Sequence, residues 1–236
     1  MTLLQKRWQV APTAPPSHVA RFPHLHPIIV QVLYNRGLTD PGDVSAFLNN
    51  EGDKSNPFAI EGMSAAVTRL RQALRAGEPI VVYGDFDTDG VTATALLVQT
   101  LRAFGGQARP YIPHRVDEGY GLHKRVLTQL AHGGTRVVVT VDCGIRSLEE
   151  VAHAKQLGLD VIITDHHSAG PQLPDTLAVI DPKRADDRYP FSELAGVGVA
   201  YKLAQALLLS HRQTPTVAQD VSLDGLIDFL RERCAG

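Results

Sequence analysis

The sequence lacks the features that mark secreted, disulfide-stabilised or membrane-spanning proteins. It has 236 residues but only two cysteines, Cys143 and Cys234, too few for a disulfide framework. Residues 1–7 lack the apolar core of a signal peptide, and no stretch approaches the ~20 consecutive apolar residues needed to cross a bilayer. We therefore expect a cytoplasmic protein with no membrane association, in which Cys143 is a buried packing residue and not a redox group.

The sequence also lacks an excess of either charge. Its 23 Lys and Arg against 25 Asp and Glu give a formal charge of −2, so the protein has no overall attraction to nucleic acid and must bind any polyanion locally. Internal repeats and low-complexity tracts are absent as well. The hydrophobic fraction of 44% is that of a globular protein with one large core or two modest domains.

The pattern of apolar residues divides the chain into three parts. Residues 1–62 are proline-rich with short helical patterns, which predicts a small helical preface. Residues 63–190 alternate helical patterns with short runs of Val and Ile. Because such runs are typical of strands buried on both faces, we expect an α/β domain with an open, mainly parallel sheet flanked by helices. Residues 191–236 contain two further helical patterns and are expected to form a carboxyl-terminal helical segment.

The expected elements can be given as residue ranges. The expected strands are 80–83, 108–112, 137–141, 161–163 and 177–180. The expected helices are 65–76, one beginning near 90, 124–131, 148–157, 199–209 and 223–232.

Acidic clusters follow three of the expected strands. They are Asp85, Asp87 and Asp89 after strand 80–83, Asp142 after strand 137–141, and Asp165, His166 and His167 after strand 161–163. Ligands of open α/β sheets bind outside the carboxyl ends of the strands, so the clusters should converge on one crevice. Alternate carboxylates share a face of an extended chain and repel one another unless a cation or protonation relieves them. The pattern therefore predicts a metal site, since an Asp-rich turn would explain one carboxylate but not three.

The types of ligand favour Mn²⁺, with Mg²⁺ as the alternative. Carboxylates mixed with imidazole suit these ions, whereas a structural zinc site calls for cysteines. The ligands outnumber what one ion needs, which predicts two ions about 3.5–4 Å apart with a shared carboxylate, an arrangement used for phosphoryl hydrolysis. An EF-hand calcium loop is excluded because its twelfth position, counted from Asp85, is Leu96 and not glutamate, and because the segment follows a strand.

The loop after expected strand 108–112 carries groups that suit nucleic acid. Arg115 can hold a phosphate bidentately, Tyr120 can stack on a base or donate to a phosphate, and Gly121 permits close backbone approach. A solvated loop in which Tyr120 packs the hinge is the alternative, and the residues alone leave both open. The glycines at 196 and 198, before helix 199–209, are interpreted as a tight helix entry and not as a phosphate site.

Together these motifs resemble those of the DHH phosphoesterase superfamily and, within it, the bacterial RecJ single-strand-specific exonucleases. The resemblance runs from about Arg7 to Leu209, and its motifs are 84–92, 111–115 with 118–122, 140–145, 164–167 and 194–200. It implies a 5′-to-3′ exonuclease that releases mononucleotides from single-stranded DNA in recombination and repair, with Mn²⁺ or Mg²⁺ as cofactor. It also implies a single-strand-binding protein or a helicase as partner.

The resemblance further implies a role for each site residue. Asp87 and Asp89 would hold separate ions and Asp142 would bridge them. His166 would be a ligand, and Asp85 a ligand or a close neighbour of one. His167 would contact or protonate the scissile phosphate, and Asp165 would orient an imidazole.

The carboxyl-terminal end departs from the family pattern. RecJ proteins continue well past this length with a further acidic motif of the metal site, a DHHA1 domain and usually an OB-fold, so residues 191–236 would begin a linker to such domains. No segment after residue 221 matches that acidic motif, and Asp181, Asp224 and Asp228 are candidates by chemistry only. Two other functions stay open: a DHH-type hydrolase of short oligonucleotides or cyclic dinucleotides, and a noncatalytic interaction subunit. The subunit would be expected to lose carboxylates that this chain retains.

Overall fold

The computed structural model describes residues 9–49 and 55–212, which fall into two compact units that divide after Lys54. The first unit contains three helices, α1 (Pro16–Val19), α2 (Pro27–Asn35) and α3 (Pro41–Leu48). Each begins at a proline, which suits the first turn because the backbone N–H missing there has no partner in a helix. Phe22, Val30, Leu33 and Val44 form the core of this unit. The predicted helical preface is confirmed.

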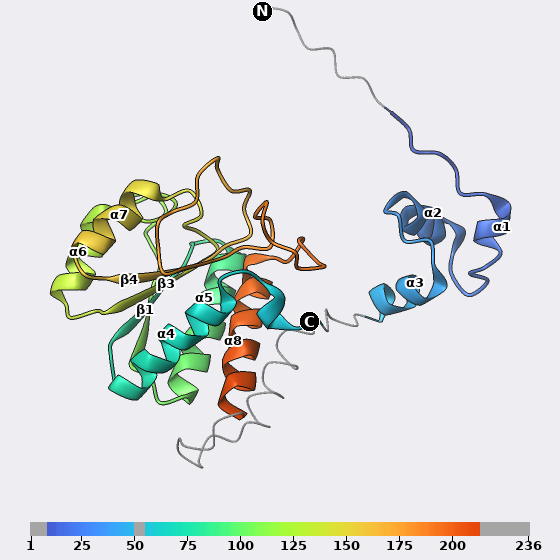
Figure 1. The fold of residues 1–236 in the computed structure, drawn as a ribbon. Helices are drawn as coiled ribbons and strands as arrows, with labels where there is room; N and C mark the ends of the chain where they lie inside the picture. Colours follow the sequence, from blue (N-terminus) through green and yellow to red (C-terminus); the bar gives the residue numbers. More distant parts are fainter. Residues whose placement is uncertain (1–8, 50–54, 213–236) are drawn as a thin grey trace, which may run out of the picture. The chain divides into compact units, whose positions relative to one another are not determined.

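The second unit is built on a five-stranded parallel sheet in the order β2-β1-β3-β4-β5 (Figure 1). Its strands are β1 (Ile80–Tyr83), β2 (Ala108–Tyr111), β3 (Val137–Val141), β4 (Asp160–Thr164) and β5 (Ala178–Ile180). Each lies within one or two residues of its predicted range, so the predicted α/β class with an open parallel sheet is confirmed.

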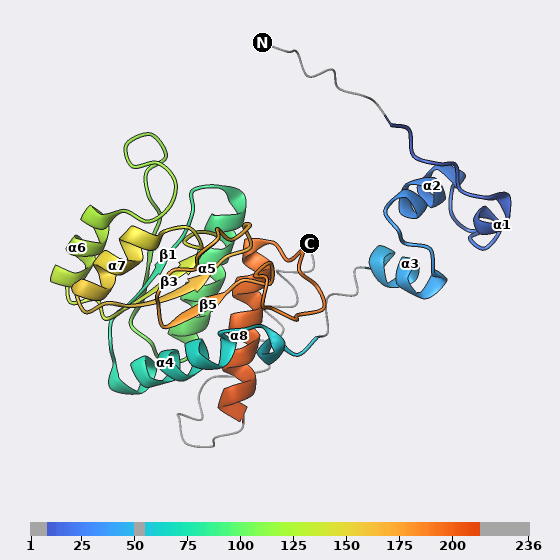
Figure 2. The ribbon, with the colours of Figure 1, turned by 45° about the horizontal axis from the view of Figure 1, so that its top comes forward.

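Helices cover both faces of the sheet (Figures 1 and 2). One face carries α4 (Met63–Ala76), α5 (Thr88–Ala103) and α8 (Gly196–Arg212), and the other carries α6 (Lys124–His132) and α7 (Leu148–Gln156). Along β1, Ile80 and Val82 pack toward α4, α5 and α8, whereas Val81 and Tyr83 pack toward α6 and α7. A strand buried on both faces needs apolar side chains at every position, which explains the continuous Val and Ile runs.

Three features differ from the sequence expectations or go beyond them. Helix α1 and a short 3₁₀ helix at Pro57–Ala59 are not predicted. Helix α8 starts at Gly196, before its predicted range, and its buried Val199 and Leu203 join the same core as the sheet. The predicted helix 223–232 lies outside the described residues. No helix in the described ranges is long and apolar enough to cross a membrane.

The order of the strands determines where a ligand can bind. The chain leaves β1 through α5 to reach β2 on one side, while β3 pairs with β1 on the other side. The chain leaves β3 through α7 to reach β4 on that other side, so the loops that follow β1 and β3 diverge. The carboxyl ends of these two strands are therefore where a ligand is expected to bind. The acidic segment 85–89 follows β1, and Asp142 follows β3.

Candidate metal centre

The loop after β1 holds its carboxylates by local hydrogen bonds. Asp85 is 5% exposed and accepts the Phe86 N–H at 2.7 Å, and Asp87 caps α5 by accepting the Gly90 N–H at 3.0 Å. A side chain at Gly90 would place its Cβ 2.6 Å from the Asp85 backbone, so only glycine lets the loop close. Burial raises the pKa of Asp85, and the charge of nearby Asp87 adds to the rise. Without a cation, the charge of Asp87 opposes the ionisation of Asp85.

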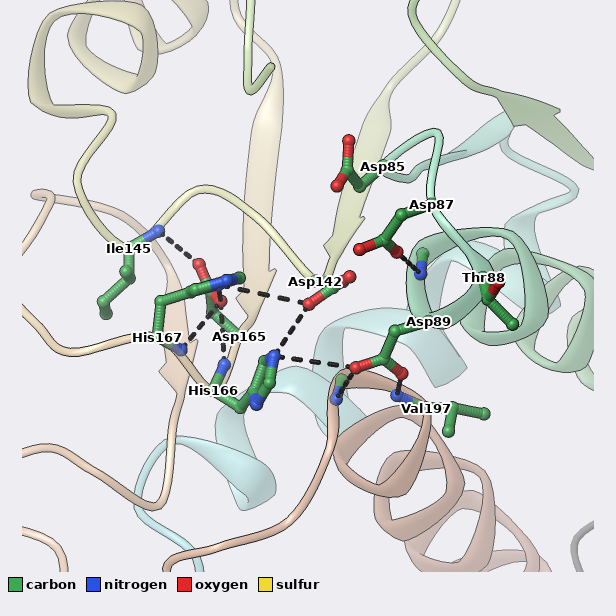
Figure 3. Close-up of polar contacts among 12 residues, drawn as sticks. Asp85, Asp87, Thr88, Asp89, Asp142, Ile145, Asp165, His166, His167 and Val197 are labelled. Atoms are coloured by element: carbon green, nitrogen blue, oxygen red, sulfur yellow. Dashed lines mark hydrogen bonds and ion pairs between the residues drawn. The ribbon is translucent and has the colours of Figure 1, made fainter. Parts of the chain in front are cut away.

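Asp142 lies at the centre of the site (Figure 3). It is 2% exposed, and in the described part of the chain it is the one residue other than glycine with a positive φ, 61°. Such a conformation costs about 1–3 kcal/mol and is often found where function requires a fixed side-chain direction. Burial raises the pKa of Asp142 to about 7, and repulsion from Asp89 and Asp87 contributes. The next residue, Cys143, is buried, in agreement with its predicted packing role.

Among the described residues, potential metal-ligating atoms gather in two groups that share Asp142. Asp85, Asp87 and Asp142 form one group, Asp142, His166 and His167 form the other, and the ligand atoms within each group lie within 4.8 Å of one another. Figure 3 shows Asp142 between the β1 loop and the two histidines. Side chains from three strand ends therefore lie together, as the sequence predicts.

The donor set fits a hard divalent ion. Oδ1 of Asp142 is buried 3.0 Å from Nε2 of His166, but the two are not aligned as a hydrogen bond, and no described residue donates to this oxygen. Two adjacent ligands of an octahedral ion at about 2.1 Å would lie about 3.0 Å apart. The unsatisfied oxygen and its separation from the imidazole are therefore those expected of a metal site, and the shared carboxylate fits a pair of ions.

Asp89, also predicted as a ligand, is held by hydrogen bonds from the start of α8. Its Oδ2 accepts the N–H of Gly196 at 2.7 Å, and its Oδ1 accepts the N–H of Val197 at 2.6 Å. Oδ2 also lies 3.6 Å from Nε2 of His166. Asp89 is outside both ligand groups, although each oxygen keeps a lone pair for an ion. The sequence interpretation missed Gly196 and Val197, whose signal was the glycine-rich start of a helix.

Asp165 and His167 form a hydrogen-bonded pair. Oδ1 of the fully buried Asp165 lies 2.7 Å from Nδ1 of His167, and the two oxygens also accept the backbone N–H groups of Ile145, His166 and His167. The bond to Asp165 raises the pKa of His167. Burial opposes ionisation of Asp165, yet these hydrogen bonds outweigh it and lower its pKa. With Nδ1 donating to Asp165, Nε2 of His167 stays available to a ligand.

The loop after β2 lies beside these groups. The hydroxyl of Tyr120 donates to the backbone carbonyl of Asp142 at 3.2 Å. The ring of Tyr120 packs edge-on against the imidazole of His167, with 5.9 Å between the ring centroids. The carbonyl of Gly121 accepts the Tyr83 hydroxyl at 3.0 Å, which ties the loop to β1. The Arg115 guanidinium lies 5.0 Å from the ring centre of Phe86. In the sequence, Phe86 stands between Asp85 and Asp87. Phe86 was missed because nothing in the sequence links it to Arg115.

Asp181, the described candidate for a further acidic ligand, belongs to neither group. It is fully buried, its Oδ1 accepts the Lys183 N–H at 2.8 Å, and its Oδ2 finds no hydrogen-bond partner among the described residues. Burial raises its pKa to about 6. The other two candidates, Asp224 and Asp228, lie outside the described residues.

The raised pKa of Asp142 predicts how stability depends on pH when metal is absent. An unfolded Asp has a pKa of about 3.9, so the folded protein holds this proton more tightly, and the resulting stability is lost as pH rises through about 7. From pH 5 to pH 8 in EDTA, the unfolding free energy of the wild type should fall by roughly 2.5 kcal/mol more than that of Asp142→Asn. Denaturant unfolding at both pH values measures this, and parallel pH dependences would contradict the assignment.

Comparison with known proteins identifies relatives of this chain. The model of the DHH family, N-terminal domain, matches residues 79–225. The single-stranded-DNA-specific exonuclease RecJ of Bacillus subtilis is 45% identical over 186 residues, which cover 78% of this chain and 24% of that protein. The protein of the same name from Escherichia coli is 46% identical over 149 residues, covering 63% and 26%. The chain therefore spans about a quarter of the length of these relatives.

Solved structures give a consistent picture. A crystal structure of exonuclease RecJ bound to manganese is similar over 73% of this chain and 43% of the chain in that structure, with a TM-score of 0.60 and 35% identity. RecJ of Thermus thermophilus in complex with Mn²⁺ matches 95% of this chain and 31% of its own, with a TM-score of 0.66 and 27% identity.

Proposed function

Because this chain belongs to the DHH family, we propose that it carries the two-metal catalytic site of a single-stranded-DNA-specific exonuclease. The reaction would be 5′-to-3′ release of mononucleotides in recombination and repair, in the cytoplasm. The observation that supports this best is Asp142, one buried carboxylate common to two groups of metal ligands beside an Asp–His pair. The names of the relatives supply the substrate.

Five residues would hold Mn²⁺ or Mg²⁺: Asp85, Asp87, Asp89, Asp142 and His166. When bound, a pair of such ions supplies activation of water and neutralisation of charge on the phosphoryl oxygens. Asp142 is a member of both ligand groups, which suits it to be the shared ligand. Asp85 and Asp87 lie on the β1 side, whereas His166 lies on the β4 side.

His167 would act on the scissile phosphate. Its Nδ1 is bound to Asp165, which leaves Nε2 to donate a proton to a phosphoryl or leaving oxygen. The raised pKa of His167 keeps the imidazole protonated to higher pH, which favours donation. Asp165 fixes the ring orientation and is itself fixed by backbone N–H groups.

The loop after β2 would bind the DNA strand. Arg115 offers a guanidinium for a phosphate, and its position above Phe86 places it beside the metal loop. Tyr120 is 52% exposed and offers a ring face to a base while its hydroxyl stays on Asp142. Gly121, with φ of 91°, lets the backbone turn at this point. A single-strand-binding protein or a helicase would deliver the strand.

A cleavage assay tests the proposal. The chain is incubated with Mn²⁺ and 5′-labelled single-stranded, duplex and dinucleotide substrates, beside Asp87→Ala and the matched control Asp175→Ala, whose carboxylate is exposed and bound to Lys155. We expect mononucleotides from single strands in the wild type and the control, and their loss in Asp87→Ala. Preference for the dinucleotide would favour the small-substrate hydrolase, and absence of cleavage with retained DNA or protein binding would favour the interaction subunit.

A further inference from the structure

The first turn of α8 meets the candidate metal centre at two points. The N–H groups of Gly196 and Val197 bind the two oxygens of Asp89, as Figure 3 shows for Val197. The α-carbon of Gly196 also lies directly against Asp142. A Cβ added at Gly196 would sit 2.7 Å from Oδ1 of Asp142 and 2.8 Å from its Cβ and Cγ, closer than real Cβ atoms approach. Helix α8 thus touches two of the proposed metal ligands.

Position 196 needs the absence of a side chain, not the backbone freedom of glycine. Gly196 is not among the residues with positive φ, so its conformation is open to any residue. What excludes a side chain is the Asp142 carboxyl group. That carboxyl cannot move away easily, because Asp142 is itself held in a left-handed conformation and is 2% exposed.

Helix α8 cannot move away either. Val199, Ala200 and Leu203 follow within two turns, and each is fully buried in the core that α8 shares with α5 and the sheet. Moving the start of the helix by the ångström or so that a methyl group requires would disturb this packing. The clash would therefore be relieved at the carboxylates.

Helix α8 also fixes the direction of Asp89. The backbone N–H groups of its first turn have no partner within the helix, and those of Gly196 and Val197 donate to the two oxygens of Asp89. These two hydrogen bonds hold the Asp89 carboxylate beside Asp142. The position of α8 therefore controls both the direction of Asp89 and the space for Asp142.

We infer that Gly196 is a positioning residue of the metal centre, which sets the carboxylate of Asp142 by leaving room for it and holds Asp89 through its N–H. This inference rests on the proposed function for the identity of the ligand, Mn²⁺. It makes the sequence Gly196-Val197 part of the site and not only a tight helix entry.

The first test compares Gly196→Ala with the matched control Gly198→Ala. An added Cβ at Gly198 meets only the Leu194 side chain, at 3.3 Å, which can shift. Calorimetric titration with Mn²⁺ should show about 10- to 100-fold weaker binding for Gly196→Ala, as for other residues that orient metal ligands, and unchanged binding for Gly198→Ala. Circular dichroism confirms that both variants are folded. Equal Mn²⁺ affinity in the wild type and Gly196→Ala would overturn the inference.

The second test needs no metal. In EDTA, Gly196→Ala should lower the melting temperature by roughly 5 °C. This drop should vanish when Asp142 is also replaced by glycine, because the side chain that meets the added Cβ is then gone. Glycine also adopts the positive φ of position 142 easily. A drop that persists in the Asp142→Gly background would show that Gly196 does not act through Asp142, and would overturn the inference. If the wild type bound no Mn²⁺, the proposed function would fail. The comparison of Gly196→Ala in the two backgrounds would still decide whether Gly196 positions Asp142.

Discussion

An Asp142→Asn variant is expected to lose cleavage by about a thousandfold, because bound metal contributes several kcal/mol to such reactions and this carboxylate belongs to both groups of ligands. Asparagine keeps the shape of the side chain but removes its charge. The number of Mn²⁺ ions bound per chain should fall with the rate. Cleavage of a labelled single strand at saturating Mn²⁺ measures the first effect, and equilibrium dialysis measures the second.

The same variant should be more stable than the wild type in EDTA at pH 8, since it no longer places an ionised carboxylate in a buried site among other aspartates. Lower activity together with higher stability separates a metal-binding role from general damage to the fold. Asp175→Asn, at an exposed ion pair, serves as the control and should change neither property. An Asp142→Asn protein that cleaves within tenfold of the wild type would contradict the role of this residue.

The second large effect is expected for His167→Gln. Loss of a positioned proton donor costs about 10²- to 10⁴-fold in rate, and we expect a decrease in this range. Mn²⁺ affinity should stay close to that of the wild type, because Nδ1 of His167 is bound to Asp165 and the proposal assigns its Nε2 to the scissile phosphate and not to an ion. Single-turnover rates at saturating Mn²⁺ measure the chemical step.

The adjacent histidine provides the comparison. His166→Gln should weaken Mn²⁺ binding, since Nε2 of His166 lies 3.0 Å from the shared carboxylate, and part of its rate should return at higher Mn²⁺ concentration. The rate of His167→Gln should not return. If added Mn²⁺ restored both variants equally, His167 would be a metal ligand and the division of roles between the two histidines would be wrong.

The sequence predicted most of the sheet and the convergence of the acidic clusters. The strands are uniformly apolar because both faces of the sheet are buried, so β1 and β3 could be located without knowing their neighbours. The carboxyl ends of parallel strands meet at one edge, so Asp87, Asp142 and His166 could be grouped from chain order alone. These inferences depend on local pattern and topology.

Other contacts could not be predicted, because they depend on where distant segments dock. Asp89 and Gly196 are 107 residues apart, and their hydrogen bond exists only because α8 packs on α5. The stacking of Arg115 on Phe86 depends in the same way on how the loop after β2 folds back. Local sequence explains a tight helix entry at Gly196, and only the docked helix shows that its α-carbon lies against Asp142.

The most direct test of the central claim is electron paramagnetic resonance of the chain titrated with Mn²⁺. If Asp142 is the ligand common to two ions, the spectrum should show two Mn²⁺ per chain that are magnetically coupled, and the coupling should be lost in Asp142→Asn. A single Mn²⁺ per chain, or two ions without coupling, would contradict the account.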